Sequence, residues 1–367
     1  MIPINAPQIG QEEIESVVKI MKSGMITHGL GAGPMVTKFE KAFAKFARAK
    51  HGIAVNTGTA ALHLALSAVN IEPNDEVILP SFTFVATAEI VVMVGAKPIF
   101  VDINPITYTI SPSEIEKAIT KRTKAIIPVD IYGLSADMQP IRKIAEKHAL
   151  AVIEDAAQAH GATYKGKTPG TFSNAACWSF YASKNMTTGE GGMITTNNDD
   201  LAEKARLMRS HGEKEKYCSL MLGHNYHMPE IQAAIGCVQL DKLPRFVAKR
   251  RENAKRLTEI LRKTDRLQLP VVPKGYEHSW YLYTVRLKKA KVKERDKIVE
   301  DLRRNGIDAA AVYMNPVHLM PYYRQFGKPK LPETEKAADQ VFSLPVHPGV
   351  TEDQIDFIGN AVLHLLK

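Results

Sequence analysis

The chain has 367 residues and carries 48 Lys and Arg against 39 Asp and Glu, which gives a net charge of +9 with neutral histidines. Hydrophobic residues make up 45% and charged residues 24%, so disorder, collagen and coiled coil are excluded for most of the length. A chain of this size predicts two domains, or one large α/β unit with an appendage.

The N-terminus and the cysteines indicate the compartment. Because the first residues lack a basic start followed by an apolar run, we expect no secretory signal. The most apolar stretch, residues 89–101, is broken by Gly, Lys and Pro well short of the ~20 residues of a membrane helix. The three cysteines, Cys177, Cys218 and Cys237, lack metal-ligand spacing. We therefore expect a cytoplasmic protein that has no metal site and does not span a membrane.

From Glu12 to about Val101 the chain alternates between helical and strand periods, which predicts a parallel sheet. The predicted elements are helices 12–23 and 36–50, strand 51–55, helix 59–69, strand 76–79, helix 81–94 and strand 97–101. Ser111 then reads as the cap of a further helix, with Pro112 in its first turn and Glu114 reaching back to the cap.

The rest of the chain predicts the end of this sheet and a second unit. Strand 124–129, helix 138–148 and strands 151–154, 176–180 and 193–196 come first, and the loop 181–192 is rich in Gly, Thr and Ser. A basic amphipathic helix over 243–266 precedes a proline-containing linker. Strand 280–287, helix 294–305, strand 308–313 and helix 351–366 then predict a smaller α+β domain. We expect a large domain over 1–242, whose N-terminal segment packs on the small domain, and a helical connection with the small domain over 243–367.

The first candidate site is the segment NTGTAA at residues 56–61, which joins a predicted strand to a predicted helix. The start of a helix offers unpaired backbone N–H groups and the positive end of the helix dipole, so phosphate binds well there. Gly58 lets the backbone approach the anion closely, and Thr59 adds a hydroxyl donor. An ordinary capped helix start is the alternative.

The second candidate is Asp155, which follows the buried strand pattern of residues 151–154. Ligands of open α/β sheets bind at the carboxyl ends of strands. Asp155 can pair there with a protonated ring nitrogen of a cofactor, and Gln158 lies within reach of the same ligand. A helix N-cap is the alternative role for Asp155.

The third candidate is Lys184, in a loop of small residues that follows an apolar strand and contains no other basic residue. Burial in such a loop favours the neutral amine, which suits this lysine to form a Schiff base and then to move a proton. A solvated loop lysine is the alternative.

These segments resemble the DegT/StrS family of sugar-nucleotide aminotransferases. The motifs that match are NTGTAAL (56–62), EDAAQAHG (154–161) and FYASKNMTTGEGG (180–192), and GHNYHM (223–228) and PVHLMPY (316–322) follow in family order. The resemblance covers nearly the whole chain. It implies an α/β fold of the pyridoxal-phosphate-dependent transferase fold type I, like that of aspartate aminotransferase, with a large, mostly parallel-sheet domain and a smaller C-terminal α+β domain.

Carried over residue by residue, the resemblance implies that Lys184 binds pyridoxal 5'-phosphate covalently and acts as the base of the proton shift, with pyridoxamine 5'-phosphate as the intermediate form. Asp155 would keep the pyridinium nitrogen protonated, and Phe84 would stack on the ring face. The remaining cofactor contacts would be Gly58, Thr59, Ala60, Gln158 and Ser179. A further phosphate contact would come from the second subunit of a homodimer with shared active sites, through Asn225.

The resemblance also implies substrate contacts. His227 stands where family members usually have arginine or lysine and sometimes asparagine, so an inter-subunit contact there is a departure from the pattern. His318 lies in a segment that the family places near the sugar, and a surface loop histidine is the alternative. Thr27, His28 and Glu190 complete the expected substrate site. Family dehydratases replace the cofactor lysine by histidine, so Lys184 favours transamination.

The sequence thus predicts transfer of an amino group from L-glutamate to the keto-sugar of a nucleoside-diphosphate sugar. The segment 315–323 resembles perosamine-synthase-like enzymes, which favours the C4 position and a role in surface polysaccharide. The alternatives are a C3-keto-sugar or inosose aminotransferase, and a non-catalytic regulatory protein that binds the cofactor or the sugar. The basic run at 249–256 is accompanied by no recognised DNA or RNA motif, so we expect no nucleic-acid partner.

Overall fold

The computed structural model describes residues 1–29 and 31–367, and a seven-stranded sheet forms its centre. Its strands are β1 (His51–Val55), β2 (Glu76–Pro80), β3 (Lys97–Val101), β4 (Thr123–Ile126), β5 (Ala151–Asp155), β7 (Ala175–Ser179) and β8 (Gly192–Thr196). The order is β1-β8-β7-β5-β4-β2-β3, and only β8 runs antiparallel to its two neighbours. The expected mostly parallel sheet is therefore confirmed, and six strands end at one edge.

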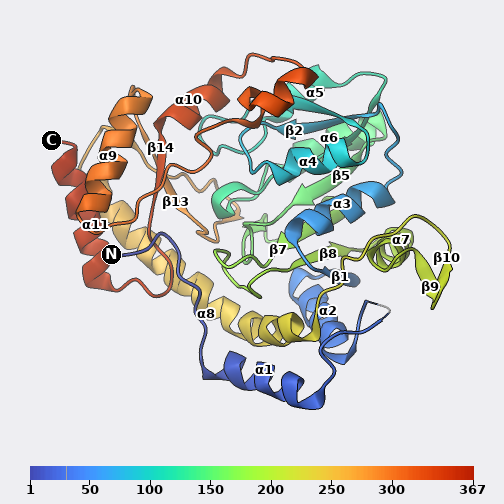
Figure 1. The fold of residues 1–367 in the computed structure, drawn as a ribbon. Helices are drawn as coiled ribbons and strands as arrows, with labels where there is room; N and C mark the ends of the chain where they lie inside the picture. The colour runs from blue at the N-terminus through green and yellow to red at the C-terminus, as the bar shows by residue number, and fades with distance from the viewer. Residues whose placement is uncertain (30) are drawn as a thin grey trace.

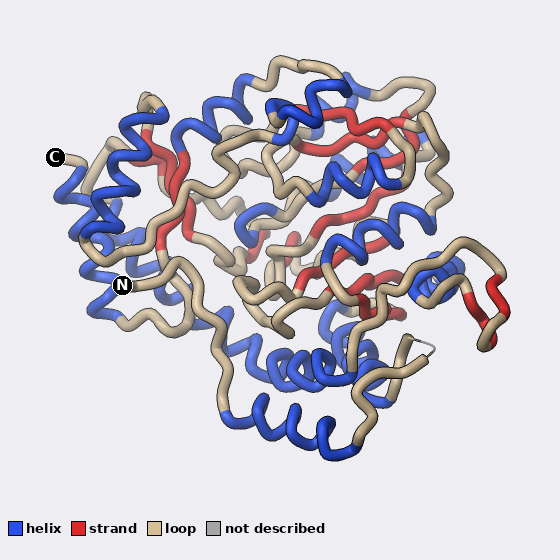
Figure 2. Tube along the Cα trace, viewed as in Figure 1, coloured by secondary structure: helices blue, strands red, loops and turns tan. Residues whose placement is uncertain are grey.

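Helices cover both faces of this sheet (Figures 1 and 2). Alternate side chains of the strands point to opposite faces, and these strands are apolar on both. One face packs on α3 (Gly58–Ala68), α4 (Ala86–Met93) and α7 (Asp199–Arg209). The other face packs on α5 (Pro112–Ala118) and α6 (Met138–His148), and further along on α2 (Pro34–Ala47) and α8 (Glu230–Leu261). The result is a three-layer α/β/α arrangement.

A smaller sheet forms the C-terminal part, in the order β11 (Leu267–Gln268), β13 (Tyr283–Leu287) and β14 (Val341–Leu344). It shares a second apolar core with α9 (Val292–Arg304), α11 (Glu352–Leu365) and the end of α8. The N-terminal segment joins it, because Ile2 pairs with Ile307 as a parallel bridge. Figure 1 shows both chain termini at this end of the molecule.

Helix α8 connects the two parts and corrects the prediction for this region. It runs unbroken over 32 residues with Pro244 inside it, so it starts well before the expected 243 and crosses the proposed boundary at 242/243. Its first half packs on α1 (Gln11–Ser23) and α2, and its second half on α11. The division into two domains stays a prediction.

Two further predictions of local structure are wrong, and a third is right only in part. Residues 81–85 form a loop and α4 begins only at Ala86, because the polar side chains of this loop are bonded to other parts of the chain. Residues 308–313 form no strand beyond a bridge from Ala310 to Ser343. Ser111 is the N-cap residue of α5 and Pro112 lies in the first turn, as predicted, but Ser111 makes no capping hydrogen bond with its side chain, whose hydroxyl bonds to that of Ser113.

Across residues 1–29 and 31–367, none of the helices combines the length and the apolar character needed to cross a membrane. Several basic side chains of the run on α8 bond to other parts of the same chain. Arg250 donates to the backbone of Trp280 and Tyr281, Arg251 donates to that of Gly161, and Arg256 pairs with Asp356.

Candidate active site

The candidate residues gather where the parallel strands end. Gly58 follows β1, Ser81 follows β2, Asp155 ends β5, and Ser179 ends β7. Because these four strands run in the same direction, their carboxyl ends lie at one edge of the sheet, which is where open α/β sheets bind ligands. Lys184 follows β7 at the same edge.

The start of α3 has the form expected of a phosphate site. Thr57 is the N-cap, and its hydroxyl accepts a hydrogen bond from the backbone N–H of Ala60 at 3.0 Å. A Cβ on Gly58 would come within 2.7 Å of the Cβ of Ser179, so only glycine lets these two segments lie this close. The start of α3, with the N–H groups that begin a helix, therefore lies against Ser179 at the end of β7.

Asp155 is buried and both of its carboxylate oxygens are bonded. Oδ2 accepts from the Thr87 hydroxyl at 2.8 Å, and Oδ1 accepts from the N–H of Ala157 at 3.2 Å. Burial raises the pKa of Asp155, while these two hydrogen bonds and the charge of Lys184 oppose the rise. The carboxylate is thus oriented by α4 and suited to a buried cationic partner.

Gln158 is buried three residues further along and is fixed at both ends of its amide. Its oxygen accepts from the N–H of Tyr132 at 2.8 Å, and its nitrogen donates to the hydroxyl of Tyr313 at 3.0 Å. The backbone of Tyr313 is left-handed, with φ of 65°. No local pattern marks Tyr313 as a residue of the site, because it lies 155 residues from Gln158 along the chain.

Lys184 is half-buried and is not a fully solvated loop lysine. Its backbone N–H closes a turn on the carbonyl of Tyr181, and its Nζ lies 4.6 Å from the ring centre of Tyr281. The electrostatic interactions of Lys184 with Asp155 and with His160 place the amine and the two side chains in one neighbourhood. Tyr281 is a second residue of the site that no local pattern marks.

Phe84 and His318 differ in exposure. Phe84 is 59% exposed in the loop after β2, so one face of its ring is available to a flat ligand. His318 lies in η2 (Val317–Leu319) and is completely buried, with Nδ1 2.7 Å from the Ser81 hydroxyl and Nε2 3.5 Å from Glu335. Burial lowers the pKa of His318. The interpretation as a surface loop histidine is wrong, and its contact with substrate stays a prediction.

The remaining candidates lie on exposed or half-buried segments. Asn225 is exposed and pairs through its backbone with Ser210, and Tyr226 beside it accepts a hydrogen bond from the N–H of Asn56 in the turn before α3. Thr27, His28 and Glu190 are exposed.

His227 is half-buried, and its Nε2 atom lies 3.0 Å from the hydroxyl of Ser210. Burial, together with the charges of Arg209, His211 and His28, lowers the pKa of His227. His28 and His227 are therefore close to each other, and the roles of these residues remain predictions.

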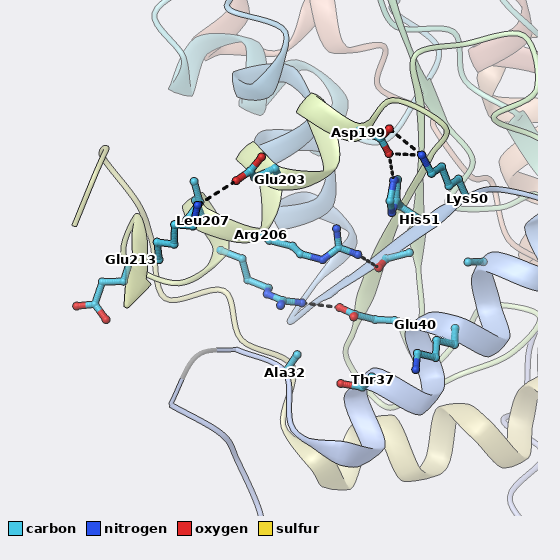
Figure 3. A pocket seen from close by; sticks show the side chains of 15 residues that line it. Ala32, Thr37, Glu40, Lys50, His51, Asp199, Glu203, Arg206, Leu207 and Glu213 are labelled. Atoms are coloured by element: carbon cyan, nitrogen blue, oxygen red, sulfur yellow. Dashed lines mark hydrogen bonds and ion pairs between the residues drawn. The ribbon is translucent and has the colours of Figure 1, made fainter. Parts of the chain in front are cut away.

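A cavity of about 740 Å³ lies elsewhere, between α2, α7 and the start of β1 (Figure 3). Several of its charges are paired with one another: Asp199 with Lys50 and His51, and Glu40 with Arg209. None of the candidate residues lines it. It is therefore separate from the site at the ends of the strands.

The fold and the site define the class. A buried carboxylate, a lysine and a helix start at the carboxyl ends of neighbouring strands are typical of pyridoxal-phosphate-dependent transferases of fold type I. The model of the DegT/DnrJ/EryC1/StrS aminotransferase family matches residues 7–363. The chain belongs to this family, and it is a pyridoxal-phosphate-dependent aminotransferase.

Individual relatives agree over nearly their whole length. The chain is 42% identical to GDP-perosamine synthase of Caulobacter vibrioides over 358 residues, which cover 97% of this chain and 95% of that protein. It is 43% identical to a pleiotropic regulatory protein of Geobacillus stearothermophilus over 347 residues, covering 93% and 92%. The crystal structure of S. venezuelae DesV in complex with a ketimine intermediate superposes with a TM-score of 0.91 at 37% identity, covering 96% and 94%.

Proposed function

We propose that the protein transfers the amino group of L-glutamate to the keto group of a nucleoside-diphosphate sugar, at C4. The observation that carries the proposal is the arrangement of Lys184, Asp155 and the α3 start at one sheet edge, together with the similarity to GDP-perosamine synthase along 97% of the chain. A role in polysaccharide biosynthesis is supported by a relative at 39% identity that is named a spore coat polysaccharide biosynthesis protein, SpsC of Bacillus subtilis.

The residues at the sheet edge fit pyridoxal 5'-phosphate. Because Gly58 has no Cβ, the start of α3 lies directly against Ser179, which brings the helix start and this hydroxyl-bearing residue together and suits the phosphate, and the buried Asp155 suits the ring nitrogen. We propose that Lys184 holds the cofactor covalently, with Thr59, Ala60 and Gln158 beside it. When bound, the cofactor supplies an electron sink that stabilises negative charge at the substrate carbon that loses its proton.

The protein's own residues then orient the reaction and move the protons. Asp155, held by Thr87 and by the N–H of Ala157, keeps a proton on the ring nitrogen by placing a negative charge beside it. Phe84 would cover one face of the ring. The Nζ atom of Lys184, once it is no longer bonded to the cofactor, would take the proton from the α-carbon of glutamate. It would then return a proton to the cofactor carbon to which the lysine had been bonded. On the keto-sugar the same steps run in reverse.

The substrate site would be completed by a second copy of the chain. We propose a homodimer in which Asn225 of the partner subunit contacts the cofactor phosphate, and in which Thr27, His28, Glu190, His227 and the His318 segment face the sugar nucleotide. Beside the Lys184 loop, α1 borders an apolar groove of about 470 Å³ with the exposed side chains Ile9, Ile14 and Val18. A second copy docked there would bury this groove and lie next to the site.

The test is turnover with a panel of keto-sugar nucleotides. We expect 2-oxoglutarate to form from glutamate only when a nucleoside-diphosphate 4-keto-sugar is present, and the NMR spectrum of the product to show the amine at C4. An amine at C3 would contradict the proposed C4 position but would still agree with a nucleoside-diphosphate sugar as the substrate. Activity on an inosose without any nucleotide sugar would contradict the proposed class of substrate.

A regulatory function is the second candidate, because a relative at 43% identity is named a pleiotropic regulatory protein. A regulator that only binds the cofactor would be coloured by pyridoxal phosphate but would release no 2-oxoglutarate with any ketone in the panel. The same assay therefore separates the two functions.

A further inference from the structure

Tyr281 reaches the site from the C-terminal part of the chain. Its ring is buried, the ring centre lies 4.6 Å from Nζ of Lys184, and its hydroxyl lies 2.9 Å from that of Ser183. It therefore touches both the lysine and the residue before it.

The backbone that carries Tyr281 is held in an unusual conformation. Trp280 has a φ of 53°, which is unfavourable for a bulky residue. A Cβ on Gly133 would lie 2.9 Å from the backbone nitrogens of Trp280 and Tyr281, so glycine is needed for this close passage. Such strain persists only where the surroundings fix it.

A buried cation anchors the same segment. Arg250 of α8 is 2% exposed and donates to the carbonyls of Trp280 and Tyr281 at 3.1 and 3.2 Å. Burial lowers the pKa of Arg250 to about 10. The strained turn, the glycine contact and the arginine together fix where the Tyr281 ring lies.

The ring of Tyr281 gives the amine of Lys184 a negatively polarised partner at short range. In the part of the chain that the structure describes, no carboxylate lies within 4 Å of Nζ of Lys184. An ammonium group over an aromatic face is attracted by the negative face of the ring, and this attraction grows when water is excluded.

We propose that Tyr281 is a positioning residue that holds Lys184 on its ring face whenever Nζ is protonated and not bonded to the cofactor. The inference rests on the proposed function of Lys184. When the neutral amine of an amino substrate replaces the lysine on the cofactor carbon, one C=N bond would be exchanged for another, and the two hydrogens of the substrate nitrogen would end on Nζ. Lys184 would thus be released as the neutral amine, which can take the proton from the α-carbon. Once it holds this proton, Lys184 is a cation that needs a resting place beside the cofactor.

The test measures how fast Lys184 of the cofactor-free protein reacts with acetic anhydride. Mass spectrometry of peptides compares its labelling with that of the exposed Lys121, and thermal unfolding checks that each variant is folded. Tyr281→Leu removes the ring, Tyr281→Phe keeps it, and a trifluorinated phenylalanine at position 281 keeps its shape but withdraws the negative charge from its face.

We expect Tyr281→Phe to label like the wild type and the trifluorinated ring to raise the labelling of Lys184 about two- to fivefold. Tyr281→Leu should raise it at least as much. Equal labelling in the wild type and the trifluorinated variant would overturn the proposal, and this variant decides the matter if Tyr281→Leu does not fold. An absorption band with pyridoxal phosphate that survives in Lys184→Ala would instead overturn the proposed function of Lys184 and leave the labelling result unaffected.

Discussion

At the scale of single residues, neighbours on one strand serve different purposes. Asp155 and Glu154 end β5, and their side chains point to opposite faces of the sheet. Asp155 faces α4 and receives the Thr87 hydroxyl, whereas Glu154 accepts from Gly170 and Ser173 on the other side. Asp155 could be predicted, because a carboxylate after an apolar strand is a recognisable pattern. The role of Thr87 could not be predicted, because its hydrogen bond to Asp155 depends on where α4 begins.

Thr87 offers a test of how Asp155 is oriented. Thr87→Val keeps the volume but removes the donor to Oδ2, so we expect kcat/KM to fall about tenfold, as for a lost hydrogen bond to a charged group. Asp155→Asn should cost at least about a hundredfold, because it removes the charge beside the ring nitrogen. Steady-state kinetics with glutamate and the keto-sugar measure both effects. Equal activity of Thr87→Val and the wild type would contradict the assigned orientation.

Asp130 and Glu154 predict a pH effect on stability. Both are almost fully buried, and Oδ2 of Asp130 and Oε1 of Glu154 have no other hydrogen-bond partner, which fits a proton shared between the two carboxyl groups. Burial and the charge of Glu154 raise the pKa of Asp130 well above 3.8, and burial raises that of Glu154 above 4.5. The folded state therefore binds more protons than the unfolded state above these values. This pair's contribution to the free energy of unfolding then falls as the pH rises toward the folded pKa values.

Asp130→Asn should reduce the fall in the free energy of unfolding with rising pH, because the amide of the asparagine can donate to Glu154 without a shared proton. From about pH 5.5 to about pH 8.5, the free energy of unfolding of the variant should gain about 1 kcal/mol or more relative to the wild type. Urea unfolding at each pH measures the difference. A difference that does not change with pH would contradict a shared proton.

At the scale of elements, the start of α3 followed from the sequence, whereas the segment after β2 did not. A Thr-Gly-Thr turn between a strand and a helix is a local signal. Residues 81–85 have helical apolar spacing, yet they form a loop because Ser81 bonds to His318, 237 residues away. Helix α8 was misplaced for a similar reason, since packing on α1, α2 and α11 sustains a helix that includes Pro244.

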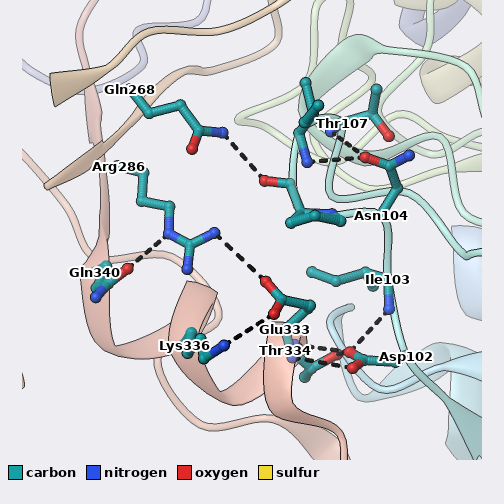
Figure 4. Close-up of polar contacts among 12 residues, drawn as sticks. Asp102, Ile103, Asn104, Thr107, Gln268, Arg286, Glu333, Thr334, Lys336 and Gln340 are labelled. Atoms are coloured by element: carbon teal, nitrogen blue, oxygen red, sulfur yellow. Dashed lines mark hydrogen bonds and ion pairs between the residues drawn. The ribbon is translucent and has the colours of Figure 1, made fainter. Parts of the chain in front are cut away.

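A helix of the C-terminal part is capped from the central sheet (Figure 4). The N-cap of α10 (Pro332–Gln340) is Leu331, which has no capping side chain. Asp102 at the end of β3 replaces it by accepting from the N–H groups of Glu333 and Thr334 and from the Thr334 hydroxyl at 2.7 to 2.9 Å. This carboxylate ties α10 to the sheet.

Asp102→Ala should lower the free energy of unfolding by about 2 kcal/mol, because it leaves three donors of α10, two of them buried, without their acceptor. Glu333→Gln is the matched control, since it weakens the ion pairs with Lys336 and Arg286 but keeps the cap. It should cost less than about 1 kcal/mol. Thermal or urea unfolding compares the two variants, and similar losses would argue against the capping role.

At the scale of the whole molecule, the site draws on both ends of the chain. The central sheet supplies Lys184 and Asp155, and the C-terminal part supplies Tyr281, Tyr313 and His318. These contacts cross about 100 to 240 residues of sequence, so they depend on the packing of the two parts and leave no local pattern. The family resemblance supplied His318 through its motif, but Tyr281 and Tyr313 lie outside the motifs.

The proposed dimer predicts a coupled loss of assembly and activity. Ile14→Glu places a charge in the apolar groove beside α1, so the burial of this groove by a second copy becomes unfavourable. We expect a shift toward the monomer in sedimentation velocity and a fall in activity, because Asn225 would no longer reach the site. Lys19→Gln is the control on an exposed position of the same helix. An unchanged dimer in Ile14→Glu would contradict docking at this groove.

The most direct test of the central assignment is the visible absorption spectrum of the purified protein with pyridoxal phosphate, before and after glutamate is added. The assignment of Lys184 predicts a band that bleaches with glutamate in the wild type and is missing in Lys184→Ala. A band that persists unchanged in Lys184→Ala, or the lack of any band in the wild type, would contradict it.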